Sequence, residues 1–136
     1  MVYVDGKKSY TVLVLYGVPQ GSVLGPLLYI LYTADIVNVF ARHGLKVHLY
    51  ADDSQVYIHV TRGAVETILP VLEACVHDVC IWSSSRKLKL NASKTEFAIF
   101  DRNKVQNGQA HYLINLGSTE IAPVTVVRDL GVQLDS

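Results

Sequence analysis

The chain has 136 residues, of which 50% are hydrophobic and 18% are charged, a balance typical of one folded domain and not of a disordered segment. Its 12 basic and 12 acidic side chains cancel, so composition gives no sign of the basic excess that free-standing nucleic-acid binders carry. The apolar run from 26 to 40 is interrupted by Asp35 and Asn38 and is shorter than the ~18 residues of a membrane span, so we expect no membrane partner. We also expect no secretory leader, and we expect Cys75 and Cys80 to be buried, reduced thiols.

The first third of the chain predicts a hairpin, a loop and a helix. Residues 10–16 are β-branched and aromatic, and the turn at 6–9 predicts their pairing with residues 2–4. A loop at 17–22 leads to Pro26, where a proline commonly begins a helix, and Gly44 is a natural stop. The apolar residues between them have helical spacing and predict one helix: Leu27, Leu28, Ile30, Leu31, Ala34, Val37 and Phe40.

Two short strands are predicted at 47–50 and 55–60, around Ala51-Asp52-Asp53-Ser54. The result is a tight hairpin with two carboxylates at its tip. In the second strand, alternation predicts that Val56, Ile58 and Val60 face inward, with Tyr57 and His59 facing outward.

The rest of the chain predicts a long helix followed by β structure. The apolar spacing from 64 to 82 is helical, although Pro70 must kink this helix or mark a second start. Further strands are predicted on either side of a turn at 91–94, with turns at 107–108 and 117–118, and residues 130–135 are predicted to end in mid-strand. The strand residues around 91–94 are Leu88, Leu90, Phe97, Ile99 and Phe100. Together these elements predict an α+β fold, with helices on one face of an antiparallel sheet.

The adjacent aspartates at the hairpin tip are the clearest chemical feature. Two like charges a few ångströms apart repel, and a divalent cation is the obvious neutraliser. Mg²⁺ prefers one or two carboxylates together with phosphate oxygens and water, and two such ions can catalyse phosphoryl transfer. The alternative is that Asp52 and Asp53 are turn-forming residues in a solvated loop.

Four segments in order resemble motifs of reverse transcriptases, and the alanine of the second points to those of non-LTR (LINE-type) retrotransposons. They are Gly17-Val18-Pro19-Gln20-Gly21-Ser22 and its continuation to Tyr29, Tyr50-Ala51-Asp52-Asp53, the run from Trp82 through Leu88-Lys89-Leu90-Asn91 to Lys94-Thr95-Glu96, and Leu130-Gly131-Val132-Gln133-Leu134-Asp135. The resemblance implies that 1–136 is a partial reverse transcriptase domain, an incomplete polymerase palm running toward the thumb. The fingers and an upstream aspartate motif are absent, since Asp5 alone precedes the glycine-rich loop among acidic residues.

The resemblance also implies roles for individual residues. Asp52 would bind the catalytic metals, Mg²⁺ or Mn²⁺ in its place, Asp53 would support the site, and Lys94 would neutralise or protonate the leaving pyrophosphate. Tyr50 and Ala51 would line the primer-terminus side. Template and nucleotide would be positioned by Gly17, Pro19, Gln20, Gly21 and Ser22. Ser22 is equally suited to capping a helix and Lys94 to a solvated surface.

One stretch of the chain is locally basic and faces either a phosphate backbone or solvent: Arg86, Lys87, Lys89 and Lys94. The five histidines lie at no ligand spacing and receive no role.

The function implied is that of an RNA-directed DNA polymerase, a nucleotidyltransferase with an RNA template, a DNA primer and deoxynucleoside triphosphates, acting in the nucleus or cytoplasm. We expect this chain alone to be inactive and, because uncovered sheet edges and apolar faces promote association, to self-associate. The alternative is a non-catalytic relic of a retroelement, at most a weak nucleic-acid or protein binding domain.

Overall fold

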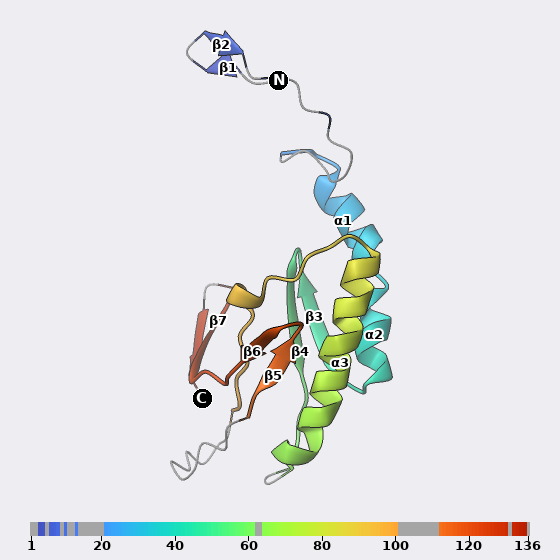
Figure 1. Ribbon diagram of the computed structural model, residues 1–136, viewed down its shortest axis with the longest axis vertical. Coiled ribbons are helices and arrows are strands. Elements are labelled where there is room, and N and C mark those ends of the chain that lie inside the picture. The colour runs from blue at the N-terminus through green and yellow to red at the C-terminus, as the bar shows by residue number, and fades with distance from the viewer. Residues whose placement is uncertain are drawn as a thin grey trace. The chain divides into compact units, whose positions relative to one another are not determined.

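The computed structural model describes residues 3–4, 6–8, 10, 13, 21–61, 64–100, 112–130 and 132–135 (Figure 1). The chain divides into two compact units, Met1–Ala34 and Asp35–Ser136. Within the described ranges, no helix combines the length and apolarity that crossing a bilayer requires. The expected strand at 10–16, apart from Tyr10 and Leu13, lies outside the described residues, as do the expected loop residues 17–20 and the expected turn at 107–108.

The first unit holds a short hairpin and a helix. Strand β1 (Tyr3–Val4) pairs antiparallel with β2 (Lys7–Lys8), and Gly6 takes φ +72° in the turn between them. The turn is therefore tighter than predicted, because Lys7 and Lys8 lie in a strand. Helix α1 (Gly25–Thr33) has a proline in its first turn, as predicted, and none of its residues is buried.

The prediction of one continuous helix as far as Gly44 is wrong. Helix α1 ends at Thr33, and α2 (Ile36–Arg42) begins after Asp35. The Asn38 N–H donates to the Asp35 carbonyl at 3.0 Å, a tighter turn than that of an α-helix, and the Asp35 carboxylate forms an ion pair with Arg86, 51 residues along the chain. This long-range partner could not be read from helical periodicity.

Gly44 ends α2 as predicted. Its N–H donates to the Ala41 carbonyl at 3.0 Å, the Leu45 N–H donates to the Phe40 carbonyl at 3.1 Å, and Gly44 takes φ +68°. These two hydrogen bonds define a Schellman motif, in which a left-handed residue follows the helix and an apolar contact usually accompanies the turn. Phe40 and Leu45 provide that contact, since both belong to the buried core.

The core of the second unit lies between two helices and a hairpin. Helix α3 (Val65–Ser85) runs without interruption through Pro70, so no second start occurs there. Strands β3 (Lys46–Tyr50) and β4 (Asp53–Tyr57) form the predicted hairpin, which Figure 1 shows beside α2 and α3. The buried residues are Ile36, Val39, Phe40, Leu45, Cys75 and Val79, against which Val47, Ile58, Leu72, Trp82 and Leu90 pack.

Alternation along the second strand predicts only in part which of its side chains are buried. Ile58 packs against the core as predicted, but Val56 and Val60 remain 39% and 41% exposed, close to the 36% of Tyr57. Tyr57 and His48 hydrogen bond at 2.9 Å and stack with ring centroids 5.2 Å apart. The inward face is therefore covered only where α2 and α3 reach it.

The strands predicted around 91–94 do not form. Residues Ala92–Lys94 are a short 3₁₀ helix, η1, and Leu88 and Leu90 lie in irregular structure. Leu90 instead packs against the helical core, and Phe97 forms an isolated bridge with Pro123. Leu90 is thus covered by tertiary packing and not by strand pairing, whereas Phe100 is 55% exposed.

Two further hairpins complete the described chain. Strand β5 (Ile114–Leu116) pairs with β6 (Thr119–Ile121) around the predicted turn, where Gly117 takes φ +64°. Strand β7 (Val126–Asp129) pairs with β8 (Val132–Asp135), so residues 130–135 contain a turn and are not one strand segment. The α+β class is confirmed, but the described strands form four separate two-stranded antiparallel sheets in place of one.

Candidate active site

The predicted carboxylates lie at the tip of the β3–β4 hairpin. Tyr50 pairs with Asp53, which leaves Ala51 and Asp52 as a two-residue loop. Because side chains alternate along a strand and Val47 packs inward, Tyr50 and Asp53 lie on the face turned away from the helical core. The tip therefore presents Asp53 on this face and Asp52 in the loop beside it.

The loop is conformationally strained at Ala51. This residue takes φ +52°, whereas Asp52 is not at positive φ. A positive φ at the first loop residue alone is the pattern of a type II′ turn, a position that glycine usually fills. The Cβ atom of alanine makes this conformation costly, and strained backbone is common where a turn positions functional groups.

Both carboxylates are open to solvent. Among the described residues, neither Asp52 nor Asp53 has an ion-pair or side-chain hydrogen-bond partner, so their oxygens remain available as acceptors. Two adjacent carboxylates match the chemistry of Mg²⁺, which takes one or two protein carboxylates and completes its shell with water and phosphate oxygens. No group of three or more His, Cys, Asp or Glu side chains suited to a metal occurs in the described ranges.

Of the five predicted loop residues, only Gly21 and Ser22 are described, while Gly17, Pro19 and Gln20 lie outside the described residues. Gly21 takes φ +84°, a conformation that favours glycine, and a Cβ atom there would meet nothing within 4 Å. The requirement for glycine is thus conformational and does not come from close packing. Ser22 does not cap the helix, because the N-cap is Leu24 and no side-chain cap hydrogen bond forms.

Lys94 lies on a different element from the aspartates, at the end of η1. Its N–H donates to the Asn91 carbonyl at 3.1 Å, and Ser93 Oγ donates to Asn91 Oδ1 at 2.7 Å, so Asn91 organises this turn. The Lys94 side chain is exposed. In the part of the chain that the structure describes, no ion pair joins it to Asp52 or Asp53.

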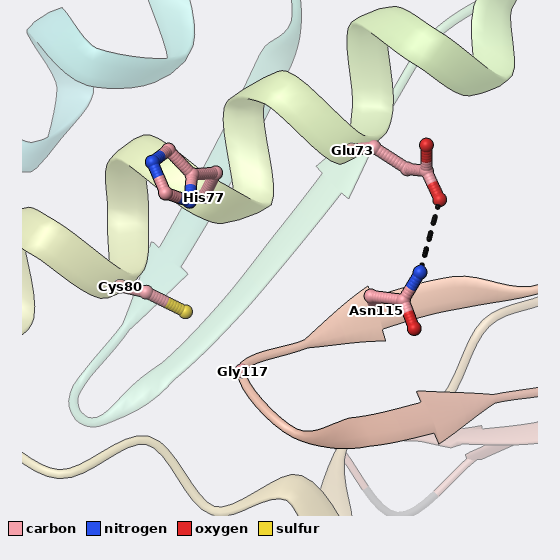
Figure 2. Close-up of a pocket in the computed structure, with 5 residues that line it drawn as sticks. All are labelled: Glu73, His77, Cys80, Asn115 and Gly117. Atoms are coloured by element: carbon pink, nitrogen blue, oxygen red, sulfur yellow. Dashed lines mark hydrogen bonds between the residues drawn. The ribbon is translucent and has the colours of Figure 1, made fainter.

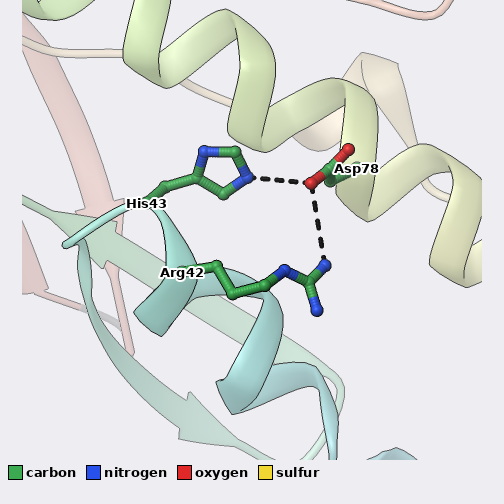
Figure 3. A network of polar contacts seen from close by, with 3 residues as sticks. All are labelled: Arg42, His43 and Asp78. Carbon is green, nitrogen blue, oxygen red and sulfur yellow. Dashed lines mark hydrogen bonds and ion pairs between the residues drawn. The ribbon is translucent and has the colours of Figure 1, made fainter.

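A polar network that sequence reasoning missed connects α2 with α3 (Figure 3). His43 Nε2 lies 2.9 Å from Asp78 Oδ2, and Arg42 Nη2 lies 3.6 Å from the same oxygen. The His43 hydrogen bond, with the positive charges of His43 and Arg42, holds the pKa of the Asp78 carboxyl below its ordinary value, against a smaller effect of burial. The partners are 35 residues apart, so no local motif could reveal them.

A small open pocket of about 230 Å³ lies between α3 and the β5–β6 turn. Figure 2 shows Glu73 accepting a hydrogen bond from Asn115 at 3.3 Å across it, and the other lining residues are His77, Cys80 and Gly117. Of the predicted site residues that the structure describes, none lines this pocket. It also corrects the prediction for the cysteines: Cys75 is buried, and burial raises the pKa of its thiol, but Cys80 is only half-buried.

Comparisons with known proteins show the family of this chain. A model of the reverse transcriptase (RNA-dependent DNA polymerase) family matches residues 1–133, and the chain belongs to this family. The expected relationship to the enzymes of non-LTR retrotransposons is confirmed by relatives among insect mobile elements.

Three such relatives align over 100 residues. The chain is 36% identical to the RNA-directed DNA polymerase from mobile element jockey of Drosophila funebris and 32% identical to that of Drosophila melanogaster, in each case over 68% of this chain and 10% of the relative. It is 33% identical to the probable RNA-directed DNA polymerase from transposon BS of Drosophila melanogaster, over 70% of this chain and 11% of the relative. The alignments thus cover about a tenth of each relative's length. No solved structure matches the chain.

Proposed function

We propose that this chain carries the carboxylate hairpin of an RNA-directed DNA polymerase palm, which adds deoxynucleotides to a primer 3′ hydroxyl by two-metal phosphoryl transfer. The observation that carries the proposal is the pair of exposed carboxylates at the hairpin tip, Asp52 in the strained two-residue loop and Asp53 at the start of β4, neither of which has a partner among the described residues. RNA template, DNA primer and deoxynucleoside triphosphates are the corresponding partners.

Each residue of the tip has a distinct part in this proposal. Asp52, in the loop, offers its carboxylate to Mg²⁺, and Asp53 adds negative charge and a second set of oxygens. Bound Mg²⁺ would supply charge neutralisation for the nucleotide phosphates and would favour deprotonation of the 3′ hydroxyl. Tyr50, which is 65% exposed on the face of Asp53, would contact the primer end.

Two further roles are proposed for residues outside the hairpin. The loop that includes Gly21 and Ser22 would position template and incoming nucleotide through its backbone. Lys94, with an exposed ammonium group, would neutralise the leaving pyrophosphate. Both roles are inferred from the resemblance of these segments to motifs of the family.

The test is primer extension with Mg²⁺ by a product that joins this chain in frame to the segments preceding it in an intact element. We expect Asp52→Asn to reduce extension at least about 100-fold, because losing a direct metal ligand should cost no less than losing the groups that support ligands. The control is Glu120→Gln, which neutralises an exposed carboxylate in β6 and should leave the rate unchanged.

Two results would contradict the proposal in different ways. Extension that survives Asp52→Asn would remove the metal-ligand assignment. Absence of Mg²⁺-dependent extension in the longer product would favour the relic, a domain that retains the hairpin without catalysis. The 136-residue chain alone is expected to be inactive in both cases, so that assay does not separate them.

A further inference from the structure

One stretch of the chain is basic although the net charge is zero. Residues 86–94, here called the basic segment, contain Arg86, Lys87, Lys89 and Lys94 and no acidic residue. Arg86 is already engaged, since it pairs with Asp35 and lies 5.6 Å from the centroid of the Trp82 ring. The three lysines are exposed, and no carboxylate among the described residues pairs with them.

Lys87 occupies a backbone conformation that disfavours it. It takes φ +57° directly after α3, where its N–H donates to the Ser84 carbonyl at 3.1 Å and the Leu88 N–H donates to the Ser83 carbonyl at 2.9 Å. This is the Schellman ending that α2 also has, but α2 places Gly44 at the left-handed position. A lysine here adds the steric cost of its Cβ atom, and such outliers often serve a function.

A contribution to folding stability explains only part of why lysines occupy these positions. A cation near a helix C-terminus is favoured by the helix dipole, which would offset some of the strain at Lys87. The effect fades beyond the last turn and does not account for Lys89 or Lys94. Leu88 and Leu90 are half-buried, with Leu90 packed on the core, so the lysines that alternate with them are directed to solvent.

We propose that Lys87 and Lys89 bind the phosphodiester backbone of a nucleic acid. This inference rests on the proposed function for its choice of partner. Lysine ammonium groups act as point charges on phosphate and read no base, so the contact would be independent of sequence. DNA and RNA share this chemistry, and the experiment below distinguishes them.

The test measures binding of the 136-residue chain to a fluorescent 20-nucleotide single strand, made as DNA and as RNA, by anisotropy over a range of salt concentrations. Divalent cations and nucleotides are omitted. Each phosphate contact contributes about 0.7 to the slope of log K against log salt for single strands, so Lys87→Ala and Lys89→Ala should each lower the slope by that amount. Lys7→Ala, at an exposed lysine in β2, is the matched control and should change nothing.

A second variant separates binding from folding. Lys87→Gly should lower the slope as much as Lys87→Ala does, yet raise Tm by about 2–4 °C because glycine relieves the strain. Weaker binding in a more stable protein cannot be a folding defect. Light scattering on every variant checks that association states match.

The results of this binding assay test the lysine contact and do not depend on whether the protein extends a primer. Equal changes in slope on DNA and RNA would show that the lysines bind the phosphate backbone that both share. A change on only one of the two would show that the lysines bind that nucleic acid. Unchanged slopes in the lysine variants, or polyglutamate competing as well as the oligonucleotide, would overturn the inference. Asp52→Asn should bind normally here, so the loss of binding and the loss of extension are independent results.

Discussion

Ala51 carries the strain of the carboxylate hairpin. Its φ of +52° costs an L-residue roughly 1–2 kcal/mol, while a glycine there would lose about 0.5–1 kcal/mol through the entropy of the unfolded chain. We therefore expect Ala51→Gly to stabilise the chain by up to about 1 kcal/mol. Ala51→Val, which adds a β-branched side chain at the same φ, should destabilise it by at least that much.

Urea unfolding of the three proteins checks this order. If the valine variant were as stable as the glycine variant, Ala51 would not be held at positive φ. Circular dichroism before unfolding shows whether each variant retains its helices.

At the residue scale, sequence predicted a candidate site and its place at a hairpin tip, but not the geometry of that tip. Asp52 and Asp53 could be proposed because a carboxylate pair between two alternating strands is a local pattern. The strain at Ala51 could not be predicted, because alanine has no preference for positive φ. His43 and Asp78 were missed for a different reason: their interaction depends on α2 and α3 being packed together.

The Asp78 network connects two elements and gives the protein a pH-dependent contribution to stability. The pKa of Asp78 is lowered from 3.8, first by the His43 hydrogen bond, so the folded state favours the ionised carboxyl. The stabilisation is therefore complete above the unfolded pKa and is lost as the pH falls through the lower, folded value. The window lies at and below about pH 4.

We expect Asp78→Asn to remove this part of the acid sensitivity. Thermal unfolding from pH 6 to pH 3 should show a smaller fall in Tm for the variant than for the unchanged protein. Glu120→Gln, at an exposed carboxylate in β6, should leave the fall as it is. Parallel curves for all three proteins would show that the His43–Asp78 contact adds nothing to folding.

The elements themselves were predictable where local signals agreed. The hairpin at 46–57, the helix through 65–85 and the stop at Gly44 follow from alternation, helical spacing and the conformational freedom of glycine. The break at Asp35 and the absence of strands at 88–100 did not, because Arg86 and the buried core decide them from a distance. Local sequence patterns thus indicate which elements can form, and long-range contacts determine which of them do form.

At the scale of the whole molecule, much apolar surface is uncovered. Helix α1 has no buried residue, and Leu27, Ile30 and Leu31 are 55%, 55% and 65% exposed. Each described sheet has only two strands, so both strands of every sheet are edges. Such surface favours association between chains.

We expect the isolated chain to scatter light as particles larger than its 15.0 kDa. Leu31→Glu should reduce the size of these particles, because a charge among the exposed apolar residues of α1 opposes apolar contact between chains. Val132→Glu, at a site 60% exposed in β8, shows whether the effect is particular to α1. A monodisperse monomer for the unchanged chain would contradict this expectation.

The two-residue loop of the hairpin also limits how this gene can change. Since strand residues alternate between faces, one codon added within β3 or β4 beside this loop would either bulge the strand or slip its pairing by a residue. A slip would turn the Asp53 carboxylate toward the side where Val47 packs. Point mutations can vary the chemistry of the tip, but in-frame insertions and deletions within its strands cannot leave its architecture intact.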